Sequence, residues 1–139
     1  MTDAAETLCE GKYLRLCRRG TWEYAERTNA GNAVIIVAMT PERNLLFVEQ
    51  YRVPMQARTI EMPAGLVGDV HADDSLEDAA KRELLEETGW SARDVRVLMV
   101  GPPSAGMSNE VIAFVRATGL ERVHAGGGDE SEDITVHEV

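Results

Sequence analysis

The stretch Arg82-Glu83-Leu84-Leu85-Glu86-Glu87-Thr88-Gly89-Trp90 ends the one segment of this chain with a clear helical signature. Asp74 or Ser75 is a suitable N-cap, because a short side-chain oxygen accepts hydrogen bonds from the free N–H groups of a first helical turn. Gly89 suits the left-handed position that follows a helix. These signals predict a helix over residues 76–88.

Glu83 and Glu87 lie on the apolar side of that predicted helix, given about 100° between successive residues, and Glu86 is near enough to join them. Carboxylates four residues apart on an inward face repel each other and resist desolvation unless a positive charge lies between them. Oxygen ligands with no histidine or cysteine nearby suit a hard cation such as Mg²⁺ or Mn²⁺. From spacing alone, a charged surface helix with ordinary ion pairs to Arg82 remains the alternative.

Acidic residues are concentrated in two segments. The 139 residues include 24 Asp and Glu against 14 Lys and Arg, a formal charge of −10. Segment 61–90 carries a net charge of −7 and segment 121–139 a net charge of −5, which leaves +2 on the rest. Even acidity would indicate only solubility and weak affinity for nucleic acid. Two concentrated acidic segments predict a cation site.

Length and composition fit one globular domain over residues 1–139, with 44% hydrophobic and 27% charged residues. The longest apolar run, 33–39, is far shorter than the about twenty residues of a membrane span. No basic stretch precedes an apolar one at the N-terminus. We therefore expect a cytoplasmic protein with no membrane or nucleic-acid partner. Cys9 and Cys17 are expected to be free thiols, with a disulfide as the less favoured alternative.

The rest of the chain alternates strand and turn patterns. Strands are expected over 12–18 and 22–27 as a hairpin, over 32–39 as a strand buried on both faces, and over 45–50, 95–100, 111–117 and 134–139. Segment 55–62 is expected to pair at a sheet edge. Segment 102–108 and the run Gly126-Gly127-Gly128 are expected to be loops, the second a flexible one. The last strand pattern runs to the final residue, which is typical of a chain that continues.

The stretch quoted first resembles the core of the Nudix box. In that box a Gly, five residues, Glu, seven residues and then Arg-Glu-apolar-x-Glu-Glu-x-Gly-apolar form a loop, a helix and a loop. Gly68, Asp74 and Arg82 keep this spacing, with Asp in place of the first Glu. Measured from Gly65 instead, the loop is three residues longer and the insert lies within 68–73. The box therefore spans about residues 65–90.

Flanking segments resemble one branch of that superfamily, the ADP-ribose and ADP-sugar pyrophosphatases. They are Met62-Pro63-Ala64-Gly65-Leu66-Val67, Gly20-Thr21-Trp22-Glu23-Tyr24, Glu49-Gln50-Tyr51-Arg52-Val53-Pro54-Met55 and Asp129-Glu130-Ser131-Glu132-Asp133-Ile134. The resemblance implies the Nudix α/β fold, an α/β/α sandwich with a mixed β-sheet, here with an N-terminal β-hairpin segment. It implies an enzyme that hydrolyses the diphosphate bond of ADP-ribose or a related nucleoside diphosphate sugar, giving a nucleoside monophosphate and a sugar phosphate.

The same resemblance implies a metal site. By this resemblance, Glu83, Glu86 and Glu87 are expected to hold the metal, helped by the backbone carbonyl of Ala64. Arg82 orients those carboxylates through charge-assisted hydrogen bonds. The implied metal is Mg²⁺, for which Mn²⁺ may substitute.

The resemblance places the general base in the late acidic segment, on Glu130 first and Glu132 second. The alternative for this segment is a solvated surface turn with no catalytic role. His71, His124 and His137 show no ligand spacing and are expected to be non-functional.

Substrate contacts are implied at Trp22, which would stack on a nucleobase with Glu23 and Arg27 close to it. Arg52 would contact a phosphate, since a planar guanidinium fits two phosphate oxygens. Segment 106–109 is expected to line the pocket. The alternative for Trp22 is a strand residue that packs on a neighbour, and the alternative for Arg52 is a surface arginine that follows a strand. Residues 1–28 form the expected dimerisation and substrate segment, because the resembling enzymes are swapped homodimers.

Competing functions remain open at this point. Within enzymes, the runner-up is a hydrolase of GDP-mannose, ADP-glucose or a broad range of nucleoside diphosphate sugars. From another class, a non-catalytic ligand sensor would keep the Nudix fold without needing Arg82, Glu83, Glu86 and Glu87. A plain cation-binding module would leave Trp22 and Arg52 unexplained.

Overall fold

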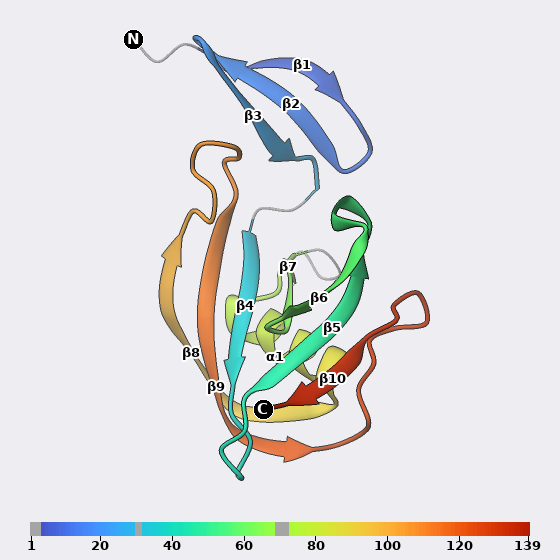
Figure 1. Ribbon diagram of the computed structural model, residues 1–139. Coiled ribbons are helices and arrows are strands. Elements are labelled where there is room, and N and C mark those ends of the chain that lie inside the picture. The colour runs from blue at the N-terminus through green and yellow to red at the C-terminus, as the bar shows by residue number, and fades with distance from the viewer. Residues whose placement is uncertain (1–3, 30–31, 69–72) are drawn as a thin grey trace.

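The computed structural model of this chain describes residues 4–29, 32–68 and 73–139. These residues form three β-sheets and one α-helix, joined by turns and loops (Figure 1). The N-terminal sheet has the order β1 (Glu6–Glu10), β2 (Leu14–Arg19), β3 (Trp22–Arg27). The central sheet has the order β7 (Ala64–Val67), β4 (Asn32–Ala38), β9 (Val111–Arg122), β8 (Trp90–Gly101). The third sheet has the order β10 (Thr135–Glu138), β5 (Leu46–Arg52), β6 (Ala57–Glu61), with the 3-10 turn η1 (Val53–Met55) between β5 and β6.

Helix α1 (Leu76–Thr88) has the predicted bounds. Ser75 is its N-cap, and the Ser75 hydroxyl accepts a hydrogen bond from the Asp78 N–H over 3.1 Å. Gly89 ends the helix in the left-handed conformation, with φ 76°, and its N–H donates to the Leu85 carbonyl. Both helix boundaries thus follow from local chemistry that the sequence displays.

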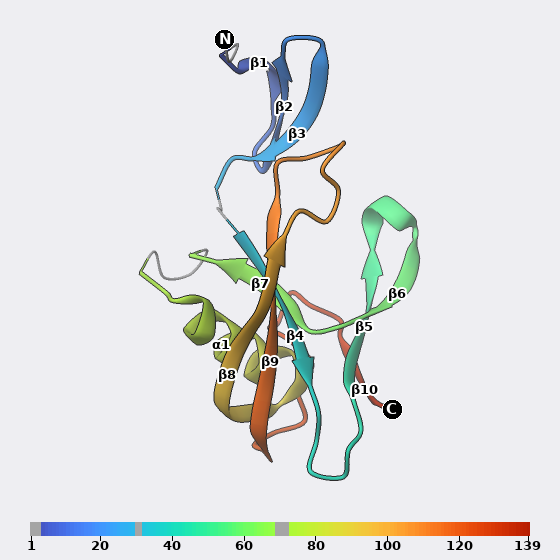
Figure 2. The same cartoon turned by 90° about the vertical axis from the view of Figure 1, so that its left-hand side faces the viewer.

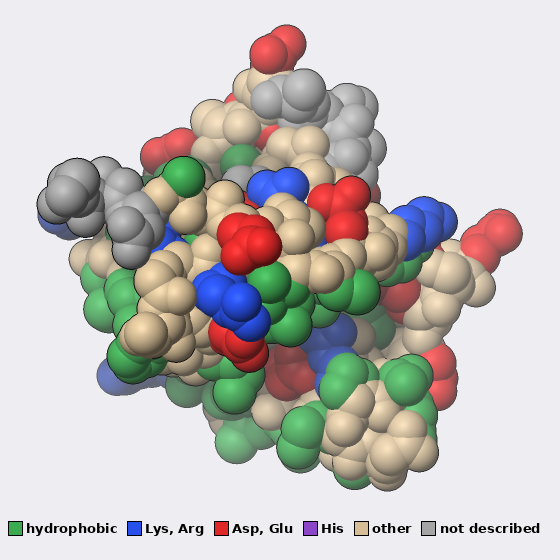
Figure 3. Space-filling view, turned by 90° about the horizontal axis from the view of Figure 1, so that it is seen from above, with side chains coloured by type: hydrophobic (Ala, Val, Ile, Leu, Met, Phe, Trp, Pro, Cys, Tyr) green, Lys and Arg blue, Asp and Glu red, His purple; other side chains and the backbone are tan. Residues whose placement is uncertain are grey.

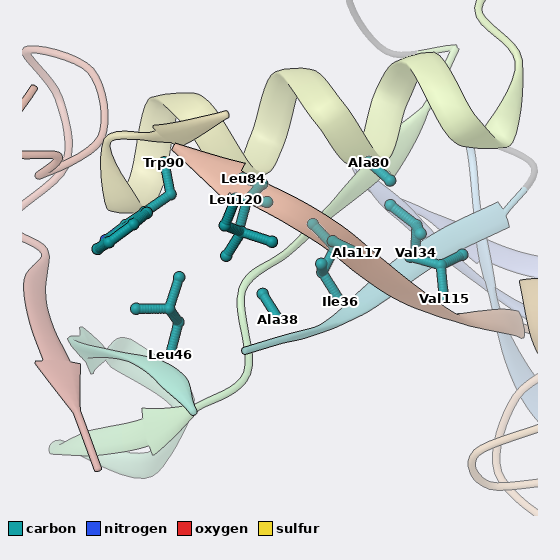
Figure 4. Close-up of a cluster of buried hydrophobic side chains, with 10 residues drawn as sticks. All are labelled: Val34, Ile36, Ala38, Leu46, Ala80, Leu84, Trp90, Val115, Ala117 and Leu120. Carbon is teal, nitrogen blue, oxygen red and sulfur yellow. The ribbon is translucent and has the colours of Figure 1, made fainter. Parts of the chain in front are cut away.

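The core lies between α1 and one face of the central sheet. Side chains that alternate along β4 and β9 meet Ala80 and Leu84 of the helix there, and Leu46 of β5 closes the cluster (Figure 4). The prediction that the strand over 32–39 is buried on both faces is wrong. From Ala33 to Ala38 its residues are alternately half-buried and buried, because α1 is the one α-helix in the described ranges and it packs on one face of β4.

The expected mixed α/β class is confirmed, as are the hairpin of β2 and β3 and the two free cysteines. β6 is an edge strand, as predicted for 55–62. β1 and β7 were not predicted, because both are short and neither shows an apolar alternation. β8 and β9 each have 12 residues and are longer than expected, since their charged outer positions hide the strand pattern. No helix in the described part of the chain is both long and apolar enough to cross a membrane.

The N-terminal sheet stands at one end of the molecule, beyond the β8–β9 hairpin (Figures 1 and 2). The end of β3 is attached to the loop of that hairpin by backbone hydrogen bonds, from Ala25 N–H to the Met107 carbonyl (2.8 Å) and from Asn109 N–H to the Ala25 carbonyl (3.4 Å). Arg27 adds an ion pair to Glu110, 2.6 Å between Nε and Oε1. This attachment fixes the N-terminal sheet next to the cleft described below.

Candidate functional site

Helix α1 turns two glutamates toward the interior. Glu83 and Glu87 are one helical turn apart, on the side of α1 that carries the buried Ala80 and Leu84. Glu87 is 5% exposed, whereas the side chain of Glu86 is 51% exposed. Two of the three glutamates therefore have the inward orientation expected from the helical period, and only Glu86 fits the surface alternative.

Burial makes the charged form of both inward carboxylates costly. Desolvation is the main cause that raises the pKa of Glu87 to about 8; the hydrogen bond from the Ala64 N–H opposes it, the charges of Glu83 and Glu132 add to it, and Arg52 opposes it more weakly. Desolvation also raises the pKa of Glu83, against the opposing effect of Arg82. A pair of buried carboxylates with raised pKa values is an arrangement that a bound cation would relieve, so these residues fit a hard metal ion.

Strand β7 passes directly against these carboxylates. The backbone N–H of Ala64 donates to Glu87 Oε2 over 3.1 Å. A Cβ at Gly65 would overlap the Glu83 side chain, so any other residue there would displace the Glu83 carboxylate. The Ala64-Gly65 pair therefore allows the backbone to line the glutamates at close range.

Arg82 lies among the carboxylates, with its side chain largely buried. Its Nη1 donates to Glu83 Oε1 over 2.7 Å and lies 3.7 Å from Glu86 Oε2, while its Nε is 3.5 Å from Asp74 Oδ2. Its Nη2 is buried and has no hydrogen-bond partner within the described ranges. No group of three or more His, Cys, Asp or Glu side chains in those ranges is arranged to hold a metal ion. In this geometry Arg82 compensates the charge of the glutamates.

These groups open into a cleft of about 420 Å³, which we call the acidic cleft. Its walls come from α1, β4, β5, β7, the end of β3 and the late acidic segment. The lining residues are Arg27, Ala33, Gln50, Arg52, Ala64, Gly65, Leu66, Arg82, Glu83, Glu86, Glu87, Asp129 and Glu132. The two acidic segments of the sequence thus meet in one place.

The acidic loop, residues 123–134, begins by capping the end of α1. The Gly127 N–H donates to the Glu87 carbonyl (2.9 Å) and the Gly128 N–H to the Glu86 carbonyl (3.0 Å). These carbonyls are among the last four of the helix, which have no partner within it. Gly126, Gly127 and Gly128 all have positive φ, of 77°, 118° and 77°. The glycine run predicted as a flexible loop is therefore a hydrogen-bonded helix cap.

The acidic loop then forms a tight turn that brings Glu132 to the cleft. The Glu132 N–H donates to the Asp129 carbonyl, and Glu132 Oε2 accepts from the Asp129 N–H (3.1 Å each). Asp129 and Glu132 line the acidic cleft, whereas Glu130 is exposed and is not among its lining residues. Of the two candidates for a general base, the structure thus brings Glu132 next to Glu83 and Glu87.

Arg52 also lines the cleft, with its guanidinium held by a residue that the sequence did not single out. Its Nε and Nη2 donate to the two carboxylate oxygens of Glu61 over 2.8 and 2.7 Å. Thr59 donates to the same carboxylate. The Arg52–Glu61 pair depends on the register of β5 and β6, which the sequence alone does not give. Gln50, also missed, lies on β5 and shares that dependence, whereas the place of Asp129, likewise missed, depends on the cap of α1 by the acidic loop.

The other predicted substrate residues are divided between two places. Arg27 reaches the acidic cleft. Trp22 is 60% exposed, and its Nε1 donates to the Gly106 carbonyl over 3.3 Å in a separate hollow that Tyr24 and Asn109 share. Glu23 pairs with Arg18 on the N-terminal sheet. One chain therefore does not bring the Trp22 ring together with the carboxylates of α1.

The three histidines show no metal-ligand geometry where they are described. His124 Nδ1 accepts a hydrogen bond from the Gly126 N–H (3.0 Å), and His137 Nε2 lies 2.7 Å from Glu49 Oε2. His71 lies outside the described residues, as does most of the predicted insert within 68–73.

Comparison with known proteins gives a consistent family. The model of the NUDIX domain matches residues 30–138. The methanol dehydrogenase activator of Bacillus methanolicus is 34% identical over 108 residues, 77% of this chain and 57% of that protein. The ADP-ribose pyrophosphatase of Bacillus subtilis is 32% identical over 108 residues, again 77% and 57% of the two chains. The GDP-mannose pyrophosphatase of an Enterobacter species is 33% identical over 118 residues, 78% of this chain and 60% of that one.

This chain thus spans a little over half the length of these curated relatives. Among solved structures, an ADP compounds hydrolase superposes with a TM-score of 0.80 and covers 99% of this chain and 76% of its own. Its sequence is 23% identical, so this likeness speaks for the fold.

Proposed function

The chain belongs to the NUDIX family, and from that premise we propose that it is a metal-dependent pyrophosphohydrolase. Its substrate would be ADP-ribose or a related nucleoside diphosphate sugar, which water cleaves at the diphosphate to give a nucleoside monophosphate and a sugar phosphate. The observation that carries the proposal is the inward pair Glu83 and Glu87 at the wall of a cleft that also holds arginines. A sensor or a structural protein has no need to bury two carboxylates at such a cost.

Glu83, Glu86 and Glu87, with the carbonyl of Ala64, would hold Mg²⁺, for which Mn²⁺ would substitute. The raised pKa of Glu87, about 8, supports this assignment because a cation offsets the cost of ionising a buried carboxylate. When bound, the metal supplies positive charge to the diphosphate and acidity to a bound water.

Arg82 would position the carboxylates, and its 2.7 Å contact with Glu83 supports that role. Arg52 and Arg27 would bind the diphosphate. Both already pair with carboxylates, Arg52 with Glu61 and Arg27 with Glu110. A phosphate would therefore compete with Glu61 and Glu110 for the two guanidinium groups, or share the groups with them. These carboxylates also hold both guanidinium groups in position before a substrate binds.

The acidic loop would supply the general base that removes a proton from the attacking water. The sequence ranks Glu130 ahead of Glu132. The place of Glu132 in the acidic cleft supports Glu132 instead, since a base must come within hydrogen-bond reach of the proton that it takes.

A homodimer would complete the substrate site, with residues 1–28 of one subunit reaching the cleft of the other and Trp22 and Glu23 contacting the nucleoside. Exposed apolar side chains of the N-terminal sheet, which stands at one end of the molecule, of the β8–β9 loop and of the β5–β6 hairpin support this. They are Tyr13, Leu14, Leu16, Trp22, Tyr51, Val53, Met55, Ile60 and Met107. Figure 3 looks onto this end, where hydrophobic side chains reach the surface beside charged ones. The protein would work in the cytoplasm on a small molecule, without a nucleic-acid partner.

The test is a panel of diphosphates incubated with Mg²⁺ or Mn²⁺ and a phosphatase, with released phosphate as the readout. ADP-ribose, GDP-mannose, ADP-glucose and a dinucleotide would separate the first choice from the related sugar nucleotides. We expect turnover of ADP-ribose that EDTA removes. Binding of a substrate without turnover would favour the sensor, and metal binding alone would favour the cation module.

Glu83→Gln gives the matching variant, and Glu77→Gln is its control, since Glu77 lies in the exposed first turn of the same helix. We expect Glu83→Gln to abolish turnover while circular dichroism and the melting temperature show a retained fold. Equal turnover in Glu83→Gln and Glu77→Gln would refute the assignment.

A further inference from the structure

The acidic loop is held at both of its ends. At its start, Gly127 and Gly128 bind the last carbonyls of α1, as described above. At its end, the side chain of Ile134 is buried and Asp133 contacts Arg58 of β6. Between these points lies the turn that carries Glu132 into the acidic cleft.

Arg58 joins three elements through one guanidinium. Its Nε donates to Glu49 Oε1 on β5 over 2.7 Å, and its Nη1 donates to Asp133 Oδ2 over 2.9 Å. Its Nη2 lies within 3.5 Å of the carbonyls of Glu49 and Asp133 and of the Thr135 hydroxyl at the start of β10. An isolated exposed ion pair restrains little. A planar group already fixed by Glu49 loses less freedom when it also binds Asp133, so this network restrains more.

Arg58 does this from the side of the sheet that faces away from the cleft. Side chains alternate between the two faces of a strand. Gln50 and Arg52 on β5 line the acidic cleft, so Glu49 and Tyr51 face the opposite way. Arg58 pairs with Tyr51 in the register and shares its face. Arg58 therefore has no route to a substrate in the cleft except through the loop.

We propose that Arg58 is a positioning residue that holds the acidic loop, and with it Glu132, over the acidic cleft. This inference rests on the proposed function for its effect on catalysis. Its effect on the loop does not depend on that function, because Arg58 holds the loop through contacts with other residues of the chain and needs neither metal nor substrate.

Hydrogen exchange of the loop amides tests the restraint directly. In Arg58→Met, we expect the Ser131 and Glu132 amides to exchange about three- to tenfold faster than in wild type, with the Leu84 amide in α1 unchanged. Arg58→Lys should restore part of the protection. Arg93→Met is the control, since Arg93 forms an exposed ion pair with the adjacent Asp94 and should leave the loop unchanged.

The kinetic arm separates positioning from general destabilisation. We expect Arg58→Met to lower kcat about two- to fivefold with KM within twofold of wild type, because the loop is open for a larger share of the time. Asp133→Asn should match Arg58→Met, and the double variant should be no slower than the slower single one. Additive losses, or no loss in kcat, would overturn the catalytic part.

The exchange result stands on its own. Unchanged exchange in Arg58→Met, or unprotected Ser131 and Glu132 amides in wild type, would overturn the restraint. Wild-type protein that hydrolyses no diphosphate would refute the proposed function, and the exchange data would still decide whether Arg58 holds the loop.

Discussion

Replacing Glu87 by Gln tests whether its buried carboxylate is kept at an energetic cost. The pKa of Glu87 is raised from 4.5 to about 8, with burial as the main cause. At a pH below 4.5 both the folded and the unfolded chain hold this proton, so folding carries no penalty. As the pH rises from 4.5 toward 8, the unfolded chain loses the proton that the folded chain keeps, and the metal-free protein loses stability at about 1.4 kcal/mol per pH unit. Above about pH 8 the loss levels off.

Gln cannot ionise, and its amide oxygen can still accept the hydrogen bond from Ala64. The free energy of unfolding would be measured by urea titration in EDTA. From pH 5.5 to pH 7.5 the stability of Glu87→Gln relative to wild type should therefore rise by roughly 2–3 kcal/mol. Added Mg²⁺ should stabilise wild type at pH 7.5 and leave the variant unchanged, because a ligand stabilises only the state that binds it. The variant should be inactive.

Glu86→Gln is the control for the pH effect, since Glu86 is an exposed neighbour on the same helix turn. Its difference from wild type should change by less than about 0.5 kcal/mol over the same pH range. Parallel stability curves for wild type and Glu87→Gln would refute the reasoning that Glu87 is held in a costly environment.

Three further outcomes are expected. Glu132→Gln should lower kcat at saturating metal by more than about tenfold and Glu130→Gln by less, as measured in steady-state kinetics, and the reverse order would favour Glu130 as the base. Gly65→Ala should lower metal-dependent turnover at least tenfold, since the added methyl group meets the Glu83 carboxylate, and a crystal structure with Glu83 unmoved would contradict this cause. Leu84→Ala should lower the free energy of unfolding by about 2–5 kcal/mol in urea, because Leu84 is fully buried between α1 and the central sheet, and a loss under 1 kcal/mol would mean that this core is loosely packed.

The helix could be predicted to the residue because its boundaries are encoded locally. Ser75 and Gly89 act on backbone groups within four residues of themselves, so no knowledge of distant contacts is needed. The inward direction of Glu87 follows from the helical period in the same way. The metal-ligand roles came from the resemblance of the whole nine-residue pattern, since an i,i+4 glutamate pair alone fits an exposed helix equally well.

The features that could not be predicted depend on pairing between segments far apart in the sequence. The run over 32–39 is apolar on both faces, and only the placement of α1 decides which face of β4 becomes the core. Arg58 and Asp133 are 75 positions apart, so their contact is invisible before the strands are registered. The glycine run 126–128 illustrates a different limit. Glycines with positive φ occur both in mobile loops and in helix caps. This run forms a cap because its N–H groups meet free carbonyls at the end of α1, which the sequence does not place beside it.

The two acidic segments acquire their meaning from that glycine cap. In the sequence they are separate concentrations of charge, of −7 and −5, and either one alone is compatible with a solvated surface. The hydrogen bonds from Gly127 and Gly128 to the end of α1 bring both segments to one cleft. There burial raises the pKa values of Glu83 and Glu87, and the charge of Glu132 adds to that effect. In the proposed function, a bound cation would offset these carboxylates for a diphosphate that Arg27 and Arg52 also bind. The same cap therefore places the carboxylates that would hold the proposed metal, and loosening the cap should weaken metal binding and substrate turnover together.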